Sequence, residues 1–103
     1  MKSIPKKDLN NGKYEDFIEN NEIYIWKRTI DGMEKIVKDP KTNVAVVFIL
    51  VGGDLKEPKE FIIKREQITN AHLDKALEIM EQNEEYEYCT KIMLLKNDKR
   101  RTK

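Results

Sequence analysis

Hydrophobic and polar residues alternate along residues 22–30, whose sequence is EIYIWKRTI. On a strand, the side chains at every second position share one face. One face would carry isoleucines, and the other would carry ring-bearing and basic residues, namely Tyr24, Trp26 and Arg28. Because β-branched and aromatic residues favour strands, this segment is predicted to be a strand with its isoleucine face turned inward.

Three further strands are predicted downstream. The dipeptide Asp31-Gly32 is typical of a two-residue hairpin turn, which makes 33–38 the returning strand. Residues 44–51 are apolar at every position, as expected of a central strand. Residues 59–64 alternate again, and the glycine-containing loop before them reads as a hairpin connection.

The apolar spacing changes to three and four residues over the segment ITNAHLDKALEIMEQN, which predicts an amphipathic helix. Thr69 or Asn70 can cap its first turn. Residues 86–95 are predicted to form a last strand, because YEYCT is rich in strand-favouring types, with a helix through 84–95 as the alternative. Residues 14–20 are predicted to be one helical turn or a hairpin arm.

These elements predict a single small α+β domain. Its sheet would be mostly antiparallel with four or five strands, and one amphipathic helix would cover one face. The helix residues expected to pack on the central strand are Leu73, Leu77 and Met80. Residues 1–13 are predicted to form an extended arm, 14–95 the domain and 96–103 a basic tail.

Net charge is +1, from 20 basic and 19 acidic residues, so overall charge favours no class of partner. The chain has one cysteine, which excludes an intrachain disulfide. Its first residues lack the apolar stretch of a signal peptide. The longest apolar run, VAVVFILV, is much shorter than the roughly 20 residues of a membrane helix. A cytoplasmic protein without membrane contact is expected.

Residues suited to catalysis are few. The only serine, Ser3, lies in the polar arm, and nothing around Cys89 or His72 marks a catalytic pair. Two nitrogen or sulfur ligands are too few for a zinc site, and VGGDLKEP lacks the phosphate-binding spacing. The protein is therefore predicted not to be an enzyme and to bind neither a metal nor a cofactor.

Protein binding is the predicted function. Tyr24, Trp26 and Arg28 are residue types enriched at the energetic centres of interfaces. A second surface could bind a basic partner through its acidic residues, namely Glu81, Glu84, Glu85 and Glu87. The chain is short, highly charged and poor in motifs, which is typical of phage or mobile-element accessory proteins, many of which bind and inhibit a host protein. A homodimer belongs to the same class.

Nucleic-acid binding is the alternative function. Aromatic side chains on a strand can stack on bases, and basic residues can contact phosphates. The basic candidates are Lys27, Lys96, Lys99, Arg100, Arg101 and Lys103. A near-neutral overall charge is unlike that of most such modules.

Overall fold

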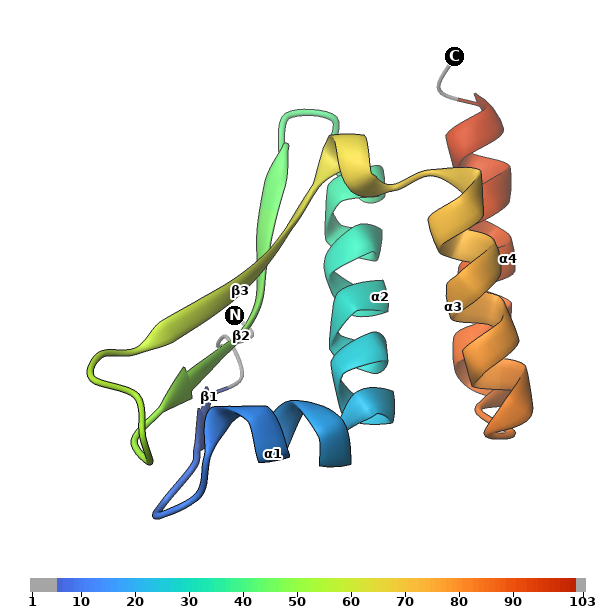
Figure 1. The fold of residues 1–103 in the computed structure, drawn as a ribbon. Coiled ribbons are helices and arrows are strands. Elements are labelled where there is room, and N and C mark those ends of the chain that lie inside the picture. The colour runs from blue at the N-terminus through green and yellow to red at the C-terminus, as the bar shows by residue number, and fades with distance from the viewer. Residues whose placement is uncertain (1–5, 102–103) are drawn as a thin grey trace.

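The computed structural model of the protein describes residues 6–101, with side chains described as far as residue 97. Short connections join its helices and strands (Figure 1). In chain order these are β1 (Lys6–Asp8), α1 (Tyr14–Asn20), α2 (Glu22–Lys38), β2 (Val44–Val51), β3 (Lys59–Lys64), a short 3-10 helix (Arg65–Gln67), α3 (Asn70–Gln82) and α4 (Tyr86–Arg101).

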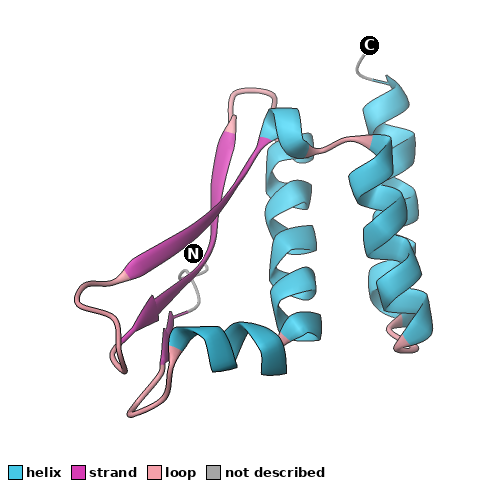
Figure 2. Ribbon diagram, in the orientation of Figure 1, coloured by secondary structure: helices cyan, strands magenta, loops and turns pink. Residues whose placement is uncertain are grey.

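The described part of the chain forms a layer of strands, the single helix α2 and a helix pair, and α1 runs from the strands to the start of α2 (Figure 2). The sheet has the order β1-β2-β3, with β1 parallel and β3 antiparallel to β2. Helix α2 lies between the sheet and the pair formed by α3 and α4 (Figure 1). The prediction of a mostly antiparallel sheet of four or five strands under one helix is therefore wrong. The domain is α+β, with four helices and a three-stranded mixed sheet within residues 6–101.

The core lies mainly between α2 and the inner face of the sheet. Phe48 and Leu50 of β2 are fully buried, and so are Ile30, Met33 and Ile36 of α2. A second part of the core joins α2 to the helix pair, through Leu73, Ala76, Met80, Ile92 and Leu95. Helix α2 therefore contributes to both halves of the core.

The predicted first hairpin is a single 17-residue helix, α2. Residues 23, 26, 30, 33 and 37 recur at intervals of three and four, and all five are buried or packed against the core. Helix α2 packs against the sheet on one side and against α4 on another, and this burial outweighs the strand preference of its first nine residues. The isoleucine-in, aromatic-out strand therefore does not exist.

Residues 86–95, which were predicted to form the last strand, instead lie in the helix α4. The alternative prediction for this segment was a helix. Ile92 and Leu95 are buried, and Tyr88 packs against the core one turn earlier. This spacing of three and four residues places these side chains against α2 and α3. The aromatic residues of YEYCT are accommodated because a helix needs only one buried stripe.

Several predictions are confirmed. Residues 44–51 form the central strand β2, residues 59–64 form β3, and α3 covers the predicted helix. The Thr69 hydroxyl accepts a hydrogen bond from the His72 amide at 3.1 Å and caps α3. The packing of α3 differs from the prediction, because α3 lies mainly against α4 and α2 rather than on β2. No helix within residues 6–101 is long and apolar enough to cross a membrane.

Arg65 joins the end of β3 to the end of α2. Its guanidinium nitrogen Nη2 donates to the carbonyl oxygens of Ile36, Asp39 and Thr42 at 2.7, 2.8 and 2.7 Å. The Nε–H donates to the Asn43 side chain at 3.2 Å. These bonds satisfy carbonyl groups that the end of a helix and the following turn leave without partners.

We expect Arg65→Lys to lower the free energy of unfolding by about 2 kcal/mol, since a hydrogen bond to a charged group contributes about 1.5–3 kcal/mol. Lysine keeps the charge, but its single ammonium cannot reproduce the planar set of donors. Urea unfolding followed by tryptophan fluorescence measures the loss. Lys75→Ala, on the exposed side of α3, is the control and should change the free energy by less than about 0.5 kcal/mol. Equal effects of the two substitutions would contradict the role given to Arg65.

Candidate functional site

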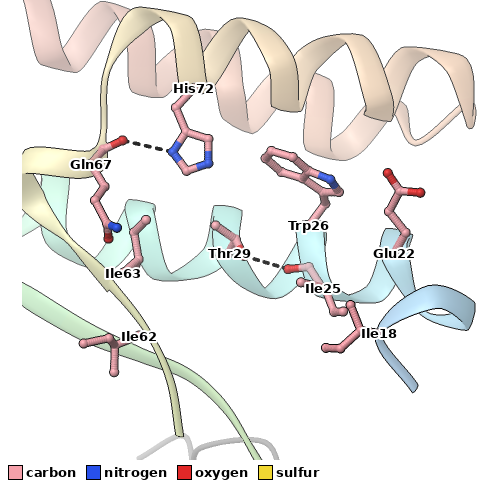
Figure 3. A pocket seen from close by; sticks show the side chains of 9 residues that line it. All are labelled: Ile18, Glu22, Ile25, Trp26, Thr29, Ile62, Ile63, Gln67 and His72. Atoms are coloured by element: carbon pink, nitrogen blue, oxygen red, sulfur yellow. Dashed lines mark hydrogen bonds between the residues drawn. The ribbon is translucent and has the colours of Figure 1, made fainter. Parts of the chain in front are cut away.

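A groove of about 420 Å³ lies where α1, α2, β3 and the start of α3 meet. Figure 3 shows its side chains, with Trp26 projecting between α2 and α3. Most of the lining surface is apolar. The lining residues are Ile18, Glu22, Ile25, Trp26, Thr29, Ile62, Ile63, Gln67 and His72.

Trp26 is the largest side chain among those that line the groove. Helix α2 turns this side chain away from the sheet, and its indole ring meets the His72 ring edge-on at a centroid distance of 5.5 Å. Trp26 is half-buried, so one part of the ring packs on the domain and another part faces the groove (Figure 3). Tryptophan combines a large rigid apolar surface with one N–H donor, which suits a binding site.

His72 and Gln67 form the polar end of the groove. The His72 Nδ1 lies 2.9 Å from the Gln67 carbonyl oxygen. Since a carbonyl oxygen only accepts, Nδ1 carries the proton, and Nε2 is an acceptor in the neutral ring. The Thr69 cap holds His72 in the first turn of α3 and so places its ring beside Trp26.

Strand β3 forms one side of the groove and is an edge strand. In the sheet order β1-β2-β3 it pairs only with β2 within the described residues. An edge strand presents a row of backbone N–H and C=O groups to any chain that lies beside it. Ile62 and Ile63 of this strand line the groove, and Ile62 is 46% exposed. The groove therefore joins an apolar pocket to an open backbone edge.

Glu22 is the only charged residue among those that line the groove. Its side chain is exposed at the first turn of α2, where the helix dipole favours a carboxylate. No ion pair involves Glu22 within the part of the chain that the structure describes. The groove thus has a negative charge at its α1 end (Figure 3).

The three residues predicted to share one surface lie in different surroundings. Tyr24 packs against the rings of Phe17 and Phe48, at centroid distances of 6.4 and 5.8 Å. Its hydroxyl is buried and has no hydrogen-bond partner among the described residues. Burial raises the pKa of Tyr24, and nearby Arg28 only partly opposes this effect. Of the three residues Tyr24, Trp26 and Arg28, only Trp26 lines the groove.

Arg28 belongs to a charged cluster between α2 and α4. It pairs with Asp31, which also accepts hydrogen bonds from Lys91 at 2.8 Å and from the Tyr88 hydroxyl at 3.2 Å. Burial alone would lower the pKa of Arg28, but the hydrogen bond to Tyr88 and the charge of Asp31 outweigh it and raise that pKa. The pKa of Lys91 is likewise raised, because Asp31 and Glu34 outweigh burial. The cluster joins α2 to α4, so Arg28 stabilises the packing of these two helices and does not line the groove.

The predicted acidic surface surrounds the turn between α3 and α4. Glu81 lies at the end of α3, Glu84 in the turn with a φ of 56°, and Glu87 in the first turn of α4. Glu85 pairs with Lys27 of α2 at 2.9 Å. The structure therefore brings a predicted phosphate-binding lysine against a predicted acidic residue, and the two charges offset one another.

The strand platform expected for stacking on nucleic-acid bases is absent, because residues 22–38 are helical. Lys96 pairs with Asp74 of α3. The backbone of Lys99, Arg100 and Arg101 belongs to the last turns of α4, and the side chains of these three residues are not described. Lys103 lies outside the described residues.

Cys89 is half-buried on α4. Burial and the charge of Glu81 raise the pKa of its thiol, which reduces the thiolate fraction at neutral pH. Reactive cysteines lie in the opposite kind of surroundings, beside positive charge. Among residues 6–97, whose side chains are described, no group of three or more His, Cys, Asp or Glu residues could hold a metal ion.

No protein-family model, curated protein or solved structure matches this chain. Sequence reasoning found Trp26 but missed its neighbours Ile18, Ile25 and His72 as parts of one groove. The capping position of Thr69 was a signal that places His72 at a helix start, but nothing in the sequence places that start beside Trp26.

Proposed function

We propose that the protein is a non-catalytic module that binds an extended segment of a partner protein in the groove beside β3. The segment lies along the open edge of β3 as an added strand, and one of its apolar side chains rests on Trp26. Basic residues of the segment face Glu22. The proposed setting is the cytoplasm, with a host protein as the partner of a small accessory protein.

The observation that carries this proposal is the juxtaposition of an open strand edge with an apolar groove that contains Trp26. Strand addition obtains affinity from backbone hydrogen bonds and specificity from pockets for alternate side chains. Both parts are present here on one side of β3. Strands β1 and β2 do not offer this combination, because β2 is central and no residue of β1 lines the groove.

Tryptophan fluorescence tests the proposal directly, because Trp26 is the only tryptophan. The probe is a synthetic peptide of alternating valine and lysine, long enough to cover β3. We expect saturable binding with a blue shift of the emission, since the peptide covers the exposed part of the ring. Isothermal titration of Trp26→Ala should show binding weakened by at least about tenfold, in keeping with the large losses seen when interface tryptophans are truncated.

Two controls separate groove binding from charge attraction. A peptide with prolines at every second position lacks the N–H groups for strand addition and should not bind. Glu22→Lys should weaken binding, whereas Glu78→Lys, exposed on α3, should not. Equal binding of the proline-containing peptide, or equal effects of the two lysine substitutions, would overturn the proposal.

A further inference from the structure

Helix α4 carries a second surface that no part of the described chain covers. Its exposed large apolar residues are Tyr86, Met93 and Leu94, at 64%, 53% and 57% exposure. Together with Thr90 and Asn97 these residues recur at intervals of three and four, so they form one stripe along the helix. The buried residues of α4, Ile92 and Leu95, point to the opposite side, toward α2 and α3. We call this stripe the α4 face.

Charge is distributed unevenly along the same helix. Residues 81–87, which lead into the first turn of α4, contain four acids and no base, and residues 96–101 at its other end contain four bases and one acid. The acidic end includes Glu84 and Glu87, both exposed. The apolar α4 face therefore lies between a negative end and a positive end.

We infer that the α4 face pairs with the α4 face of a second copy of this chain, in an antiparallel arrangement about a two-fold axis. In that arrangement the acidic end of each helix lies beside the basic end of the other, and the two helix dipoles oppose. A parallel pair would instead bring like charges together at both ends. A two-fold interface also requires a self-complementary surface, which this charge pattern supplies.

The positions of the exposed residues along α4 determine which residues of the two helices lie opposite one another. If the axis passes between residues 91 and 92, Thr90 lies opposite Met93 of the partner subunit, and Tyr86 lies opposite Asn97 of the partner subunit. One helix on each side buries less surface than an obligate dimer, so the pair is expected to dissociate in the micromolar range. The α4 face does not include the groove residues, and this inference does not rest on peptide binding.

Sedimentation velocity of the full chain over the micromolar concentration range tests the inference. The wild type should convert from monomer to dimer, and Met93→Glu should weaken the dimer by at least about tenfold by placing a charge at the centre of the interface. Val44→Glu is the matched control, since Val44 is 47% exposed but lies on β2, away from α4. Circular dichroism and thermal melting confirm that both variants fold. A wild type that stays monomeric throughout the range, or a larger effect of Val44→Glu than of Met93→Glu, would overturn the dimer.

The orientation has its own test. The double variant Glu84→Lys with Glu87→Lys makes both ends of the helix basic. An antiparallel dimer then opposes like charges and should weaken severalfold, and added sodium chloride should partly restore it by screening. In a parallel dimer the two acidic ends already lie side by side, and the substitutions would replace them by two basic ends. The dissociation constant of a parallel dimer would therefore stay the same. An unchanged dissociation constant would therefore overturn the antiparallel arrangement.

Discussion

Phe48→Ala is expected to destabilise the protein by about 3–5 kcal/mol, the usual cost of removing a fully buried phenylalanine. Phe48 of β2 is 0% exposed. Its ring stacks on Phe61 at a centroid distance of 4.4 Å, and Phe17 and Tyr24 approach at 6.2 and 5.8 Å. The substitution therefore removes the centre of a cluster that joins α1, α2, β2 and β3.

A domain of this size has a total stability of about 5–15 kcal/mol, so this single change removes a large share of it. Urea unfolding monitored by circular dichroism measures the shift in midpoint. Phe48→Leu is the matched control, because it keeps much of the volume and should cost less than half as much. A loss below about 1 kcal/mol for Phe48→Ala would show that the ring does not lie in the core.

Gly32→Leu is expected to lower the free energy of unfolding by about 2–3 kcal/mol, because it overfills the contact between α2 and the sheet. A Cβ atom built on Gly32 would lie 2.9 Å from the Ile63 Cγ2 and 3.4 Å from the Val47 Cγ2. Both contacts are methyl groups of β-branched side chains held in strands, which have little freedom to move. The gain in helix propensity on replacing glycine, about 1 kcal/mol, offsets only part of the cost.

A series of side chains of increasing size at position 32 separates the steric cost from the gain in helix propensity. Gly32→Ala, Gly32→Val and Gly32→Leu should become progressively less stable in thermal melting, whereas helix propensity alone would rank the valine variant below the leucine variant. In a double-mutant cycle, Ile63→Ala, which removes the Cγ2 methyl group, should reduce the cost of Gly32→Ala, since the two side chains compete for one space. A Gly32→Leu variant more stable than the wild type would contradict the close packing of α2 on β2 and β3.

Gly32 also explains why the first hairpin was predicted wrongly. Asp31-Gly32 is typical of a hairpin turn when only its neighbours along the chain are considered. In the fold, Gly32 lies in the middle of a helix because a side chain there would prevent α2 from approaching the sheet. Asp31 joins α2 to α4 through Lys91 and Tyr88. Both residues serve contacts with elements distant in the sequence.

The candidate site was only partly accessible to sequence reasoning. Trp26 was selected by residue type, and it does line the groove. Tyr24 and Arg28 were grouped with it because they alternate on a strand. On a helix, residues two apart point in nearly opposite directions, so the group separates. The groove itself comes from four elements whose relative positions no local pattern specifies.

The sequence by itself determined the elements whose local pattern and tertiary surroundings agree. The apolar run of β2, the alternation of β3 and the capped amphipathic α3 each meet in the fold the burial that their periodicity predicts. The tertiary structure alone decided residues 22–38 and 86–95, where aromatic and β-branched residues favour a strand over a few positions but a longer stripe fits a helix. The physical reason is burial, since α2 between the sheet and the helix pair, and α4 against α2 and α3, each remove more apolar surface from water than local backbone preference can offset.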